Sequence, residues 1–390
     1  MDQPDSLSDR AHKLAPALAE RARATEENRA VLPETIREFQ EAGLFKALQP
    51  SRFGGDEADP IDFFDAVLEV ASMCGSSAWV LSVVAVHSWQ LALFPLEAQE
   101  DVWAGDETVL ISSSYAPTGT VTRVEGGFEL SGRWSFSSGC DHAGWAFLGG
   151  VVPKDAHGPQ VPDMRTFLIP RSDYRIDDVW YVAGLGGSGS KDIVVDRAFV
   201  PEYRTHSFAD VLRMESPGNL ANAGSLFKLP FGGMFCYAIA VPALGVAQGA
   251  LAGFRERCQS RVAQADPRAP EAPFDQLELA EGSAALDAVH LQVRRNFQEM
   301  TGHAQAGTQP TLERRAWYRW NAARTTRIAA QVVDGIFAAS GGHAIALSHP
   351  LQQKFRDVHA MQAHANNAWQ KAAQVFARAD LGYPNREFLL

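Results

Sequence analysis

The feature that most constrains the fold is the order of hydrophobic patterns along the chain, which change from helical to strand-like and back to helical. Apolar residues recur at helical spacing in the first quarter of the chain, β-branched and aromatic runs broken by turns follow, and long helical periodicity fills the remainder. We therefore predict an α+β protein with an N-terminal helical domain (1–107), a central β domain (108–212) and a C-terminal four-helix bundle (213–390). Few large soluble enzymes segregate their elements in this way, although the order alone does not give a function.

Proline at the start and glycine at the end mark several of the expected helices. The expected N-terminal helices are 14–27, 33–42, 60–73 and 79–94, with a short amphipathic helix through Trp103. The expected strands are 109–115, 120–124, 128–131, 145–152, 165–169 and 193–200. The four long C-terminal helices are expected at 236–263, 274–306, 312–340 and 350–381, with a proline-bearing loop at 267–273.

The composition is that of an ordinary globular enzyme and argues against several classes of protein. The formal net charge is -11 and no basic block is present, so neither nucleic acid nor an anionic membrane is expected as the main partner. The four cysteines lie far apart without a CxxC pair, so we expect no disulfide framework and no metal site. The apolar run 79–86 is too short to span a bilayer. We identify no secretory leader and expect a cytoplasmic location.

The run 356–364, which reads Arg-Asp-Val-His-Ala-Met-Gln-Ala-His, is expected to carry the catalytic base. On one continuous helix, Asp357 and His364 fall on nearly the same face, whereas His359 points away from both. A carboxylate near an imidazole can hold its tautomer or raise its pKa, and an imidazole titrates near neutral pH. The alternative is a surface helix with solvated charges.

A second informative segment, 134–142, reads Trp-Ser-Phe-Ser-Ser-Gly-Cys-Asp-His and follows a predicted strand. Small hydroxyl residues before a glycine leave backbone N–H groups free, so this turn can bind the edge of a flat heteroaromatic cofactor. Ser138 offers a hydroxyl for this purpose, and Trp134 or Phe136 can pack near a ring. The alternative is a polar β-turn beside core aromatic residues.

Three further segments hold candidate side chains. The strand 109–115 ends in three serines and Tyr115, which either line a cleft or form a hydroxyl-rich strand end. Trp79 and His87 lie about 80° apart on one helix and can line one side of a pocket, although a buried histidine is more often a satisfied core residue. The glycine-rich run 184–190 lacks the Walker lysine and precedes a strand, so it fails as a phosphate loop.

Together and in this order, these segments resemble the flavin-dependent monooxygenases built on the acyl-CoA dehydrogenase fold, over nearly the whole chain. The resemblance is carried by Ser112-Ser113-Ser114 with Ala116-Pro117, Trp134 with Ser137 to His142, Ser188-Gly189-Ser190, and Phe355 to His359 with His364. It is strongest to the oxygenase components of two-component phenol hydroxylases of the 4-hydroxyphenylacetate 3-hydroxylase and 3-hydroxy-9,10-secosteroid 4-hydroxylase types. Each motif alone is weak, whereas jointly they are specific.

The resemblance implies that an NAD(P)H-dependent reductase supplies reduced flavin, FMNH2 or FADH2, which reacts with O2 to form a C4a-hydroperoxide. This species is expected to hydroxylate a phenolic or polycyclic aromatic substrate in the ortho position, with His364 as base, Ser113 on the substrate hydroxyl and Ser138 near flavin N5. The implied catalytic residues are His87, Ser113, Ser138 and His364, of which His87, Ser113 and His364 also bind substrate. The implied cofactor-binding residues are Trp79, Ser113, Ser114, Tyr115, Trp134, Ser137, Ser138, Gly139, Ser188 and Ser190. A homotetramer formed through the helical bundle is also expected.

Two departures from the family pattern bear on the substrate rather than on the reaction class. Phenylacetate-type members carry an arginine in the segment that matches 228–233, where this chain has Gly232 and Gly233. Lys228 is the single cation in that segment. The tail 385–390 also differs from the ending of those hydroxylases.

Three rival functions are considered. An acyl-CoA dehydrogenase needs a glutamate as base, and Ala365 stands where many dehydrogenases carry it, so this function is disfavoured. An N- or S-oxygenating enzyme of the same fold stays open. A helical scaffold or flavin-storage protein would leave Ser138 and His364 dispensable.

Overall fold

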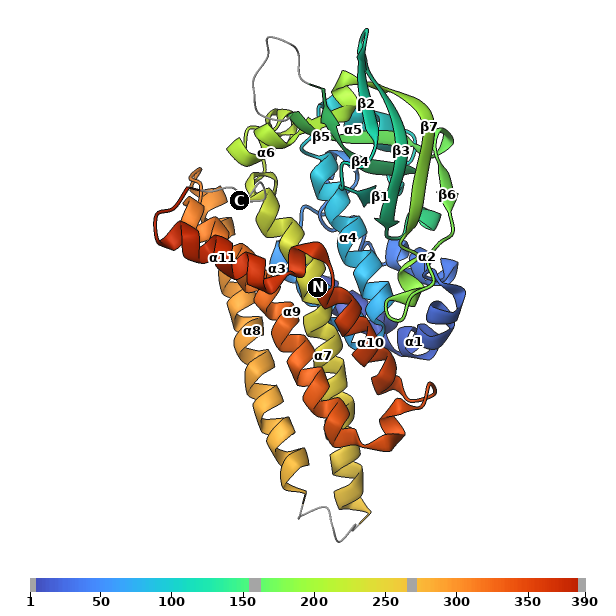
Figure 1. Ribbon diagram of the computed structural model, residues 1–390, viewed down its shortest axis with the longest axis vertical. Helices are drawn as coiled ribbons and strands as arrows, with labels where there is room; N and C mark the ends of the chain where they lie inside the picture. Colours follow the sequence, from blue (N-terminus) through green and yellow to red (C-terminus); the bar gives the residue numbers. More distant parts are fainter. Residues whose placement is uncertain (1–4, 154–162, 265–271, 385–390) are drawn as a thin grey trace.

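The computed structural model describes residues 5–153, 163–264 and 272–384. Figure 1 shows the β-strands gathered at one end of the molecule and the long helices α7, α8 and α9 running away from them, with α4 beside both parts. The helical, strand and helical segments follow one another as predicted, which confirms the α+β architecture.

The N-terminal helices begin at residues with recognisable capping chemistry. Pro33 and Pro60 start the second and third helices, and the side chain of Asp59 caps the third. The first helix starts earlier than predicted because Ser6 and Asp9 form a capping box. In the described chain these helices are α1 Leu7–Asn28, α2 Pro33–Glu41, α3 Pro60–Met73, α4 Gly75–Leu91 and α5 Leu96–Trp103.

The described strands form two four-stranded sheets, with the orders β1-β4-β5-β8 and β2-β3-β7-β6. β1 and β4 run parallel, whereas the other neighbours are antiparallel. The first sheet contains β1 Ile111–Ser114, β4 Trp145–Val152, β5 Asp163–Pro170 and β8 Thr205–Ser207, and the second contains β2 Thr120–Val124, β3 Gly127–Ser137, β6 Arg175–Asp177 and β7 Lys191–Pro201. Phe128, Trp134 and Phe167 are almost fully buried in the core that the two sheets share.

β3 is longer than the predicted strand 128–131. Its pairing with β7 is irregular near Gly132 and again between Trp134 and Ser137, and these irregularities break the alternation that marks a strand in the sequence. The residues 134–137 therefore belong to the strand, and the turn that we predicted there begins at Ser138.

The C-terminal part differs from the prediction at its end. The described helices are α6 Phe208–Arg213, α7 Phe231–Ala263, α8 Pro273–Gln305, α9 Leu312–Ser340, α10 Pro350–Gln362 and α11 Trp369–Asp380. The predicted continuous helix 350–381 is wrong, because α10 ends at Gln362 and a short 3-10 turn separates it from α11. Most of the predicted loop 267–273 and the tail 385–390 lie outside the described residues.

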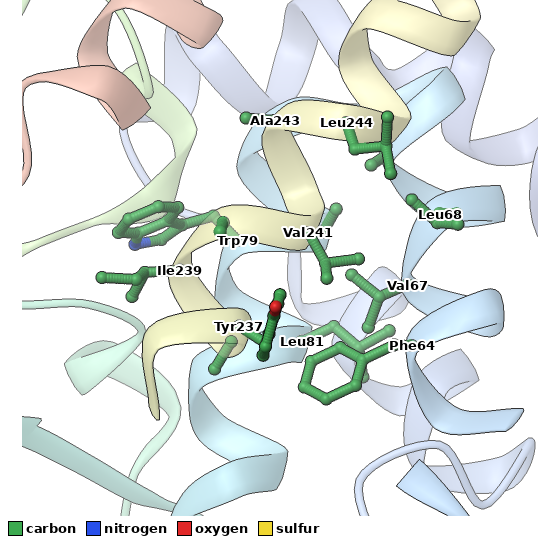
Figure 2. Close-up of a cluster of buried hydrophobic side chains, with 14 of the residues drawn as sticks. Phe64, Val67, Leu68, Trp79, Leu81, Tyr237, Ile239, Val241, Ala243 and Leu244 are labelled. Atoms are coloured by element: carbon green, nitrogen blue, oxygen red, sulfur yellow. The ribbon is translucent and has the colours of Figure 1, made fainter. Parts of the chain in front are cut away.

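One hydrophobic core joins helices from both ends of the chain. Figure 2 shows Phe64 and Val67 of α3, Leu81 of α4, and Tyr237 and Val241 of α7 packed in this core. The N-terminal helices and the bundle are therefore held together by shared apolar burial.

α7 lies at the centre of this core and is tied to α4 by a side-chain hydrogen bond. Pro242 lacks the backbone N–H that would bond the carbonyl of Ala238, and Ser82 Oγ donates to that oxygen instead at 2.7 Å. Within the described residues α7 is the one helix long and apolar enough to cross a membrane, yet 83% of its most apolar window is buried inside the protein. Its apolar character is that of a core helix.

Candidate active site

α4 has one partly accessible side chain, Val83, and every other residue of the helix is buried. Trp79 lies about one turn before Val83 and His87 about one turn after it, so the three side chains form a stripe on one side of the helix. The two rings are roughly 12 Å apart along the helix axis. We call the surface at the partly exposed Val83, between Trp79 and His87, the α4 gap.

Four partly accessible side chains from other elements lie beside these two rings. Ser138 bonds to Trp79, and Ser113 bonds to His87. The ring of His364 lies 5.7 Å from that of Trp79, and the ring of Phe235 on α7 lies 6.3 Å from that of His87. The structure thus brings predicted residues from four distant segments to one place.

Three hydroxyls, which we call the serine triad, form a chain beside Trp79. Ser138 Oγ lies 2.7 Å from Ser190 Oγ, which lies 2.7 Å from Ser188 Oγ. Ser188 and Ser190 come from the segment 183–190, here called the serine loop, which precedes β7. The glycine-rich segment, which we predicted not to be a phosphate loop, instead brings two hydroxyls to the end of β3.

The two hydrogen bonds within the triad leave one proton free, on Ser138 if the donors run from Ser188 toward Ser138 and on Ser188 if they run the other way. Trp79 Nε1–H donates to Ser138 Oγ at 3.0 Å. A hydroxyl has one proton and two lone pairs, so Ser138 can accept from both Trp79 and Ser190 and direct its own O–H outward. In that arrangement Ser138 is a preoriented donor for a ligand atom.

Gly139 lets this turn lie directly on α4. Its φ is 69°, in the left-handed region, and a Cβ there would lie 2.9 Å from Val80 Cγ1. Its backbone N–H donates to the carbonyl of Ser188 at 3.0 Å. Gly139 therefore fixes the position of Ser138, and its N–H bonds within the protein.

The two predicted ring-packing residues have different environments. Trp134 is fully buried between the sheets, and its indole N–H donates to the carbonyl of Gly149 at 2.8 Å. It is therefore part of the core between the two sheets. Phe136, two residues on, has a φ of 68° and is 71% exposed, and its ring lies roughly perpendicular to that of Trp180 at 6.0 Å between centroids. Phe136 is therefore an exposed aromatic ring two residues before Ser138.

His87 and Ser113 form a hydrogen-bonded pair with a defined direction. The His87 Nδ1 atom lies 2.7 Å from the carbonyl of Ile111, which can only accept, so Nδ1 carries the proton. Nε2 is then an acceptor, and Ser113 Oγ donates to it at 2.8 Å. Burial lowers the pKa of His87 to about 4, which keeps the ring neutral.

Aromatic rings enclose this pair. Phe147 and Tyr115 meet the ring of His87 edge-on, at 5.9 and 6.2 Å between centroids. Phe235 contacts Tyr115 at 5.4 Å and stacks on Phe231 at 4.2 Å. This end of the α4 gap is therefore largely aromatic, and its polar groups include the Ser113 hydroxyl, the imidazole and the Tyr115 hydroxyl, which donates to Gln90 Oε1.

His364 occupies the cap of the short turn that breaks the predicted helix. Its Nδ1 accepts a hydrogen bond from the backbone N–H of Asn366 at 3.2 Å, so in the neutral ring the proton is on Nε2. Desolvation lowers the pKa of His364 to about 4. The ring is thus held by its own local backbone.

The predicted pairing of Asp357 with His364 is wrong. Because α10 ends at Gln362, the two residues do not share a helix face, and Asp357 Oδ1 accepts instead from the backbone N–H of Leu185 at 2.6 Å. His359 lies on the surface and pairs with Asp334.

Two other predicted serines are bonded or buried within the protein. Ser114 Oγ donates to the carbonyl of Ser135 at 2.7 Å, and Ser137 is fully buried in β3. In the segment 228–233, Gly233 is buried, and a Cβ there would lie 2.5 Å from Met300 Sδ, so a larger residue requires the Met300 side chain to move. Lys228 is exposed.

Sequence reasoning missed Phe235 and Val83. Phe235 follows Phe231 by one turn in an apolar helix, where nothing distinguishes it from the core. Val83 is equally ordinary in sequence, because its accessibility depends on what the rest of the chain leaves uncovered.

Comparisons with known proteins agree with this arrangement. The acyl-CoA dehydrogenase N-terminal domain matches residues 5–106, and the acyl-CoA dehydrogenase C-terminal domain matches residues 237–369. The chain is 42% identical to the flavin-dependent monooxygenase oxygenase subunit HsaA of Rhodococcus jostii (strain RHA1), over 95% of this chain and 97% of that protein. It is 32% identical to the p-hydroxyphenylacetate 3-hydroxylase oxygenase component of Acinetobacter baumannii, over 97% of this chain and 89% of that one.

The overall structure gives the same result. The crystal structure of 3-HSA hydroxylase from Rhodococcus sp. RHA1 matches with a TM-score of 0.96 and 41% identity, over 99% of both chains. The fold predicted from the order of segments is thereby confirmed. The chain belongs to the flavin-dependent monooxygenases of the acyl-CoA dehydrogenase fold.

Proposed function

We propose that this protein is the oxygenase component of a two-component aromatic hydroxylase, which uses reduced flavin and O2 to hydroxylate a phenolic substrate in the ortho position. The observation that carries this proposal is the α4 gap, where the Ser138 hydroxyl bonded to Trp79 and the pair of Ser113 and His87 lie on either side of the partly exposed Val83. Reduced flavin supplies the electrons that activate O2. The substrate supplies the aromatic ring that receives the oxygen.

The flavin end fits an aromatic heterocycle. Ser138 offers an outward O–H for a ring nitrogen of the flavin, and Phe136 offers a free aromatic face beside it. Trp79 closes the inner side, with Ile239 of α7 beside it in the apolar cluster (Figure 2). Ser188 and Ser190 act on the flavin indirectly, because they orient the Ser138 hydroxyl. A flavin bound against these residues would displace water from Ser138, and shielding from water limits the wasteful release of H2O2.

The substrate end fits a phenol. Ser113 donates its proton to His87 Nε2, so its lone pairs are free to accept the phenolic O–H. A proton taken from the phenol can pass through the Ser113 hydroxyl to Nε2 of His87. The phenolate is the more electron-rich form of the ring and is attacked more readily by an electrophilic oxygen.

His364 complements this pair from the other end. In the neutral ring that the Asn366 bond selects, Nε2–H is a donor, so His364 hydrogen-bonds an oxygen atom and does not take a proton from one. We therefore move the expected base function from His364 to the pair of His87 and Ser113, and we assign a donor function to His364.

The polycyclic character of the substrate is supported by the rings of Phe235, Phe147 and Tyr115 around His87. An N- or S-oxygenating function has less support, because amines and sulfides are oxygenated at a heteroatom lone pair and need no phenolic hydroxyl to be bound by Ser113. The dehydrogenase function has least support, because Ala365 cannot act as a base.

Reduced flavin, as FMNH2 or FADH2, is expected to come from an NAD(P)H-dependent reductase, since relatives are described as oxygenase subunits or components. We also propose a cytoplasmic homotetramer. Exposed apolar side chains on the bundle support assembly, namely Phe274, Leu277 and Leu291 on α8 and Leu381 and Tyr383 after α11. Light scattering of the purified protein tests this state, and a monomer would contradict it.

The reaction is tested by mixing anaerobically reduced FMN or FAD with O2 and separate phenols, indoles and sulfides. We expect hydroxylated phenols, with little H2O2 when a good substrate is present. Products from sulfides alone, or oxidation of an acyl-CoA without O2, would overturn the proposal.

A further inference from the structure

Asp357 on α10 is a buried carboxylate that holds a distant backbone segment. Its side chain is 2% exposed, and its Oδ1 accepts from the N–H of Leu185 at 2.6 Å. The neighbouring cations are engaged elsewhere, since Arg356 pairs with Glu26 and Lys354 donates to a backbone carbonyl. Burial raises the pKa of Asp357 to about 7. Burial of a carboxylate costs free energy, so its position calls for a structural or functional reason.

The serine loop lies directly on α10. A Cβ at Gly184 would lie 2.1 Å from the carbonyl oxygen of Arg356, so the loop backbone touches the helix. Arg356 Nη1 also donates to the carbonyl of Ala183 at 2.6 Å. Leu185 has a φ of 56°, a left-handed conformation that costs a non-glycine residue about 1 kcal/mol. The bond from Asp357 therefore holds a residue that would relax without it.

From Leu185, hydrogen bonds lead to both parts of the proposed flavin end. The carbonyl of Leu185 accepts from the backbone N–H of Ser188 and from the indole N–H of Trp180, each at 3.0 Å. Ser188 continues into the serine triad, and Trp180 supports the ring of Phe136. The hydroxyl donor and the aromatic face thus depend on one backbone unit.

The second oxygen of Asp357 faces the start of α4. A Cβ at Gly75 would lie 2.8 Å from Oδ2, and α4 begins without a side-chain cap of its own. Negative charge is favourable at a helix N-terminus, where backbone N–H groups are unpaired. The same carboxylate therefore contacts the helix that carries Trp79 and the loop that carries the triad.

We propose that Asp357 is a positioning residue that fixes the serine triad and Phe136 relative to Trp79, without contacting flavin or substrate. The inference rests on the proposed function, because the triad has a catalytic use only if flavin binds beside it. It gives a use to the Arg-Asp pair of the C-terminal run that is separate from His364.

The test compares Asp357→Ala with Asp357→Asn, which keeps an acceptor for the Leu185 N–H. Asp334→Asn is the control, since it breaks only the surface pair with His359. Gly184→Ala pushes the loop off α10 from the other side and serves as a second variant if Asp357→Ala does not fold. Hydrogen exchange of the flavin-free proteins is measured over 183–191, and H2O2 per flavin oxidised is measured with substrate.

In Asp357→Ala and Gly184→Ala we expect exchange in the serine loop to rise roughly tenfold or more, and H2O2 release to rise several-fold. Asp357→Asn should stay within about twofold of the control in both measurements. Unchanged exchange in Asp357→Ala, or faster exchange with normal coupling, would overturn the inference. If the wild-type protein does not couple oxidation of reduced flavin to product, the proposed function fails. The exchange data still report whether Asp357 holds the serine loop.

Discussion

His87 and His364 lie near opposite ends of the α4 gap, and they share one property and differ in another. Both rings are kept neutral, because desolvation lowers each pKa to about 4. Their protons are on opposite nitrogens, however. Nδ1 of His87 donates to the carbonyl of Ile111, whereas Nδ1 of His364 accepts from the N–H of Asn366.

This contrast shows that the chemical role of a histidine is decided by the backbone group that meets its far nitrogen. The carbonyl of Ile111 keeps the proton on Nδ1 of His87, so Nε2 is an acceptor. The N–H of Asn366 occupies Nδ1 of His364, so Nε2 carries the proton and is a donor. In the proposed function, His87 therefore accepts a proton and His364 donates a hydrogen bond, although they are the same residue type with similar pKa values.

The largest expected effect is on hydroxylation after His87→Ala. Loss of the acceptor should reduce product formation roughly a thousandfold, as is common when a general base is removed. Single-turnover product analysis with reduced flavin measures this effect. A phenol acidic enough to be ionised in solution should recover most of the loss. Equal loss for both phenols would mean that His87 serves only to shape the site.

Acid should destabilise the fold through His87. The unfolded ring has a pKa near 6.5 and the folded ring about 4, so above pH 6.5 both states are neutral and no energy is lost. Between pH 6.5 and 4 the unfolded state takes up the proton and the folded state does not. The free energy of unfolding should therefore fall by about 3 kcal/mol over this range. Urea unfolding of wild type and His87→Gln at several pH values measures the difference. If the free energy of unfolding changed with pH equally in both proteins, His87 would be able to take up a proton in the folded state.

Replacing His364 separates a donor from a base. His364→Ala should lower coupled hydroxylation roughly 10- to 30-fold, the cost of one hydrogen bond to a charged or developing oxyanion. His364→Gln offers an amide N–H and should recover a large part of this loss, measured as product per flavin oxidised. A base would not be rescued in this way, because a glutamine side chain cannot take up a proton at neutral pH.

Much of the fold could be predicted because local patterns agree with the tertiary structure. The bounds of α3, β2 and β4 match the predicted ones residue for residue, since proline, glycine and strand alternation mark them clearly. The break after Gln362 was missed because no glycine or proline marks it. His364 caps the following turn with its ring, which is outside the usual capping residues.

For the candidate site, the sequence could supply the residues to examine but not their hydrogen bonds. Ser138, Ser113, His87 and His364 could be named from motifs, whereas the partners that set their roles are backbone atoms of Ile111 and Asn366. Backbone atoms carry no sequence signal. Trp134 and Phe136 illustrate the same limit, because only the bulged end of β3 decides which ring is buried and which is free.

The smallest expected effect is the most direct test of the contrast between the two histidines. One backbone hydrogen bond is worth about 1 kcal/mol, so each ring should favour its tautomer by roughly 5 to 1. Nitrogen chemical shifts of 15N-labelled imidazoles at pH 7.5 distinguish the forms, with His87→Gln and His364→Gln to assign the signals. We expect protonated Nδ1 in His87 and protonated Nε2 in His364. If both rings carried the proton on the same nitrogen, one of the two proposed roles would have to be exchanged, and His364 could again act as the base.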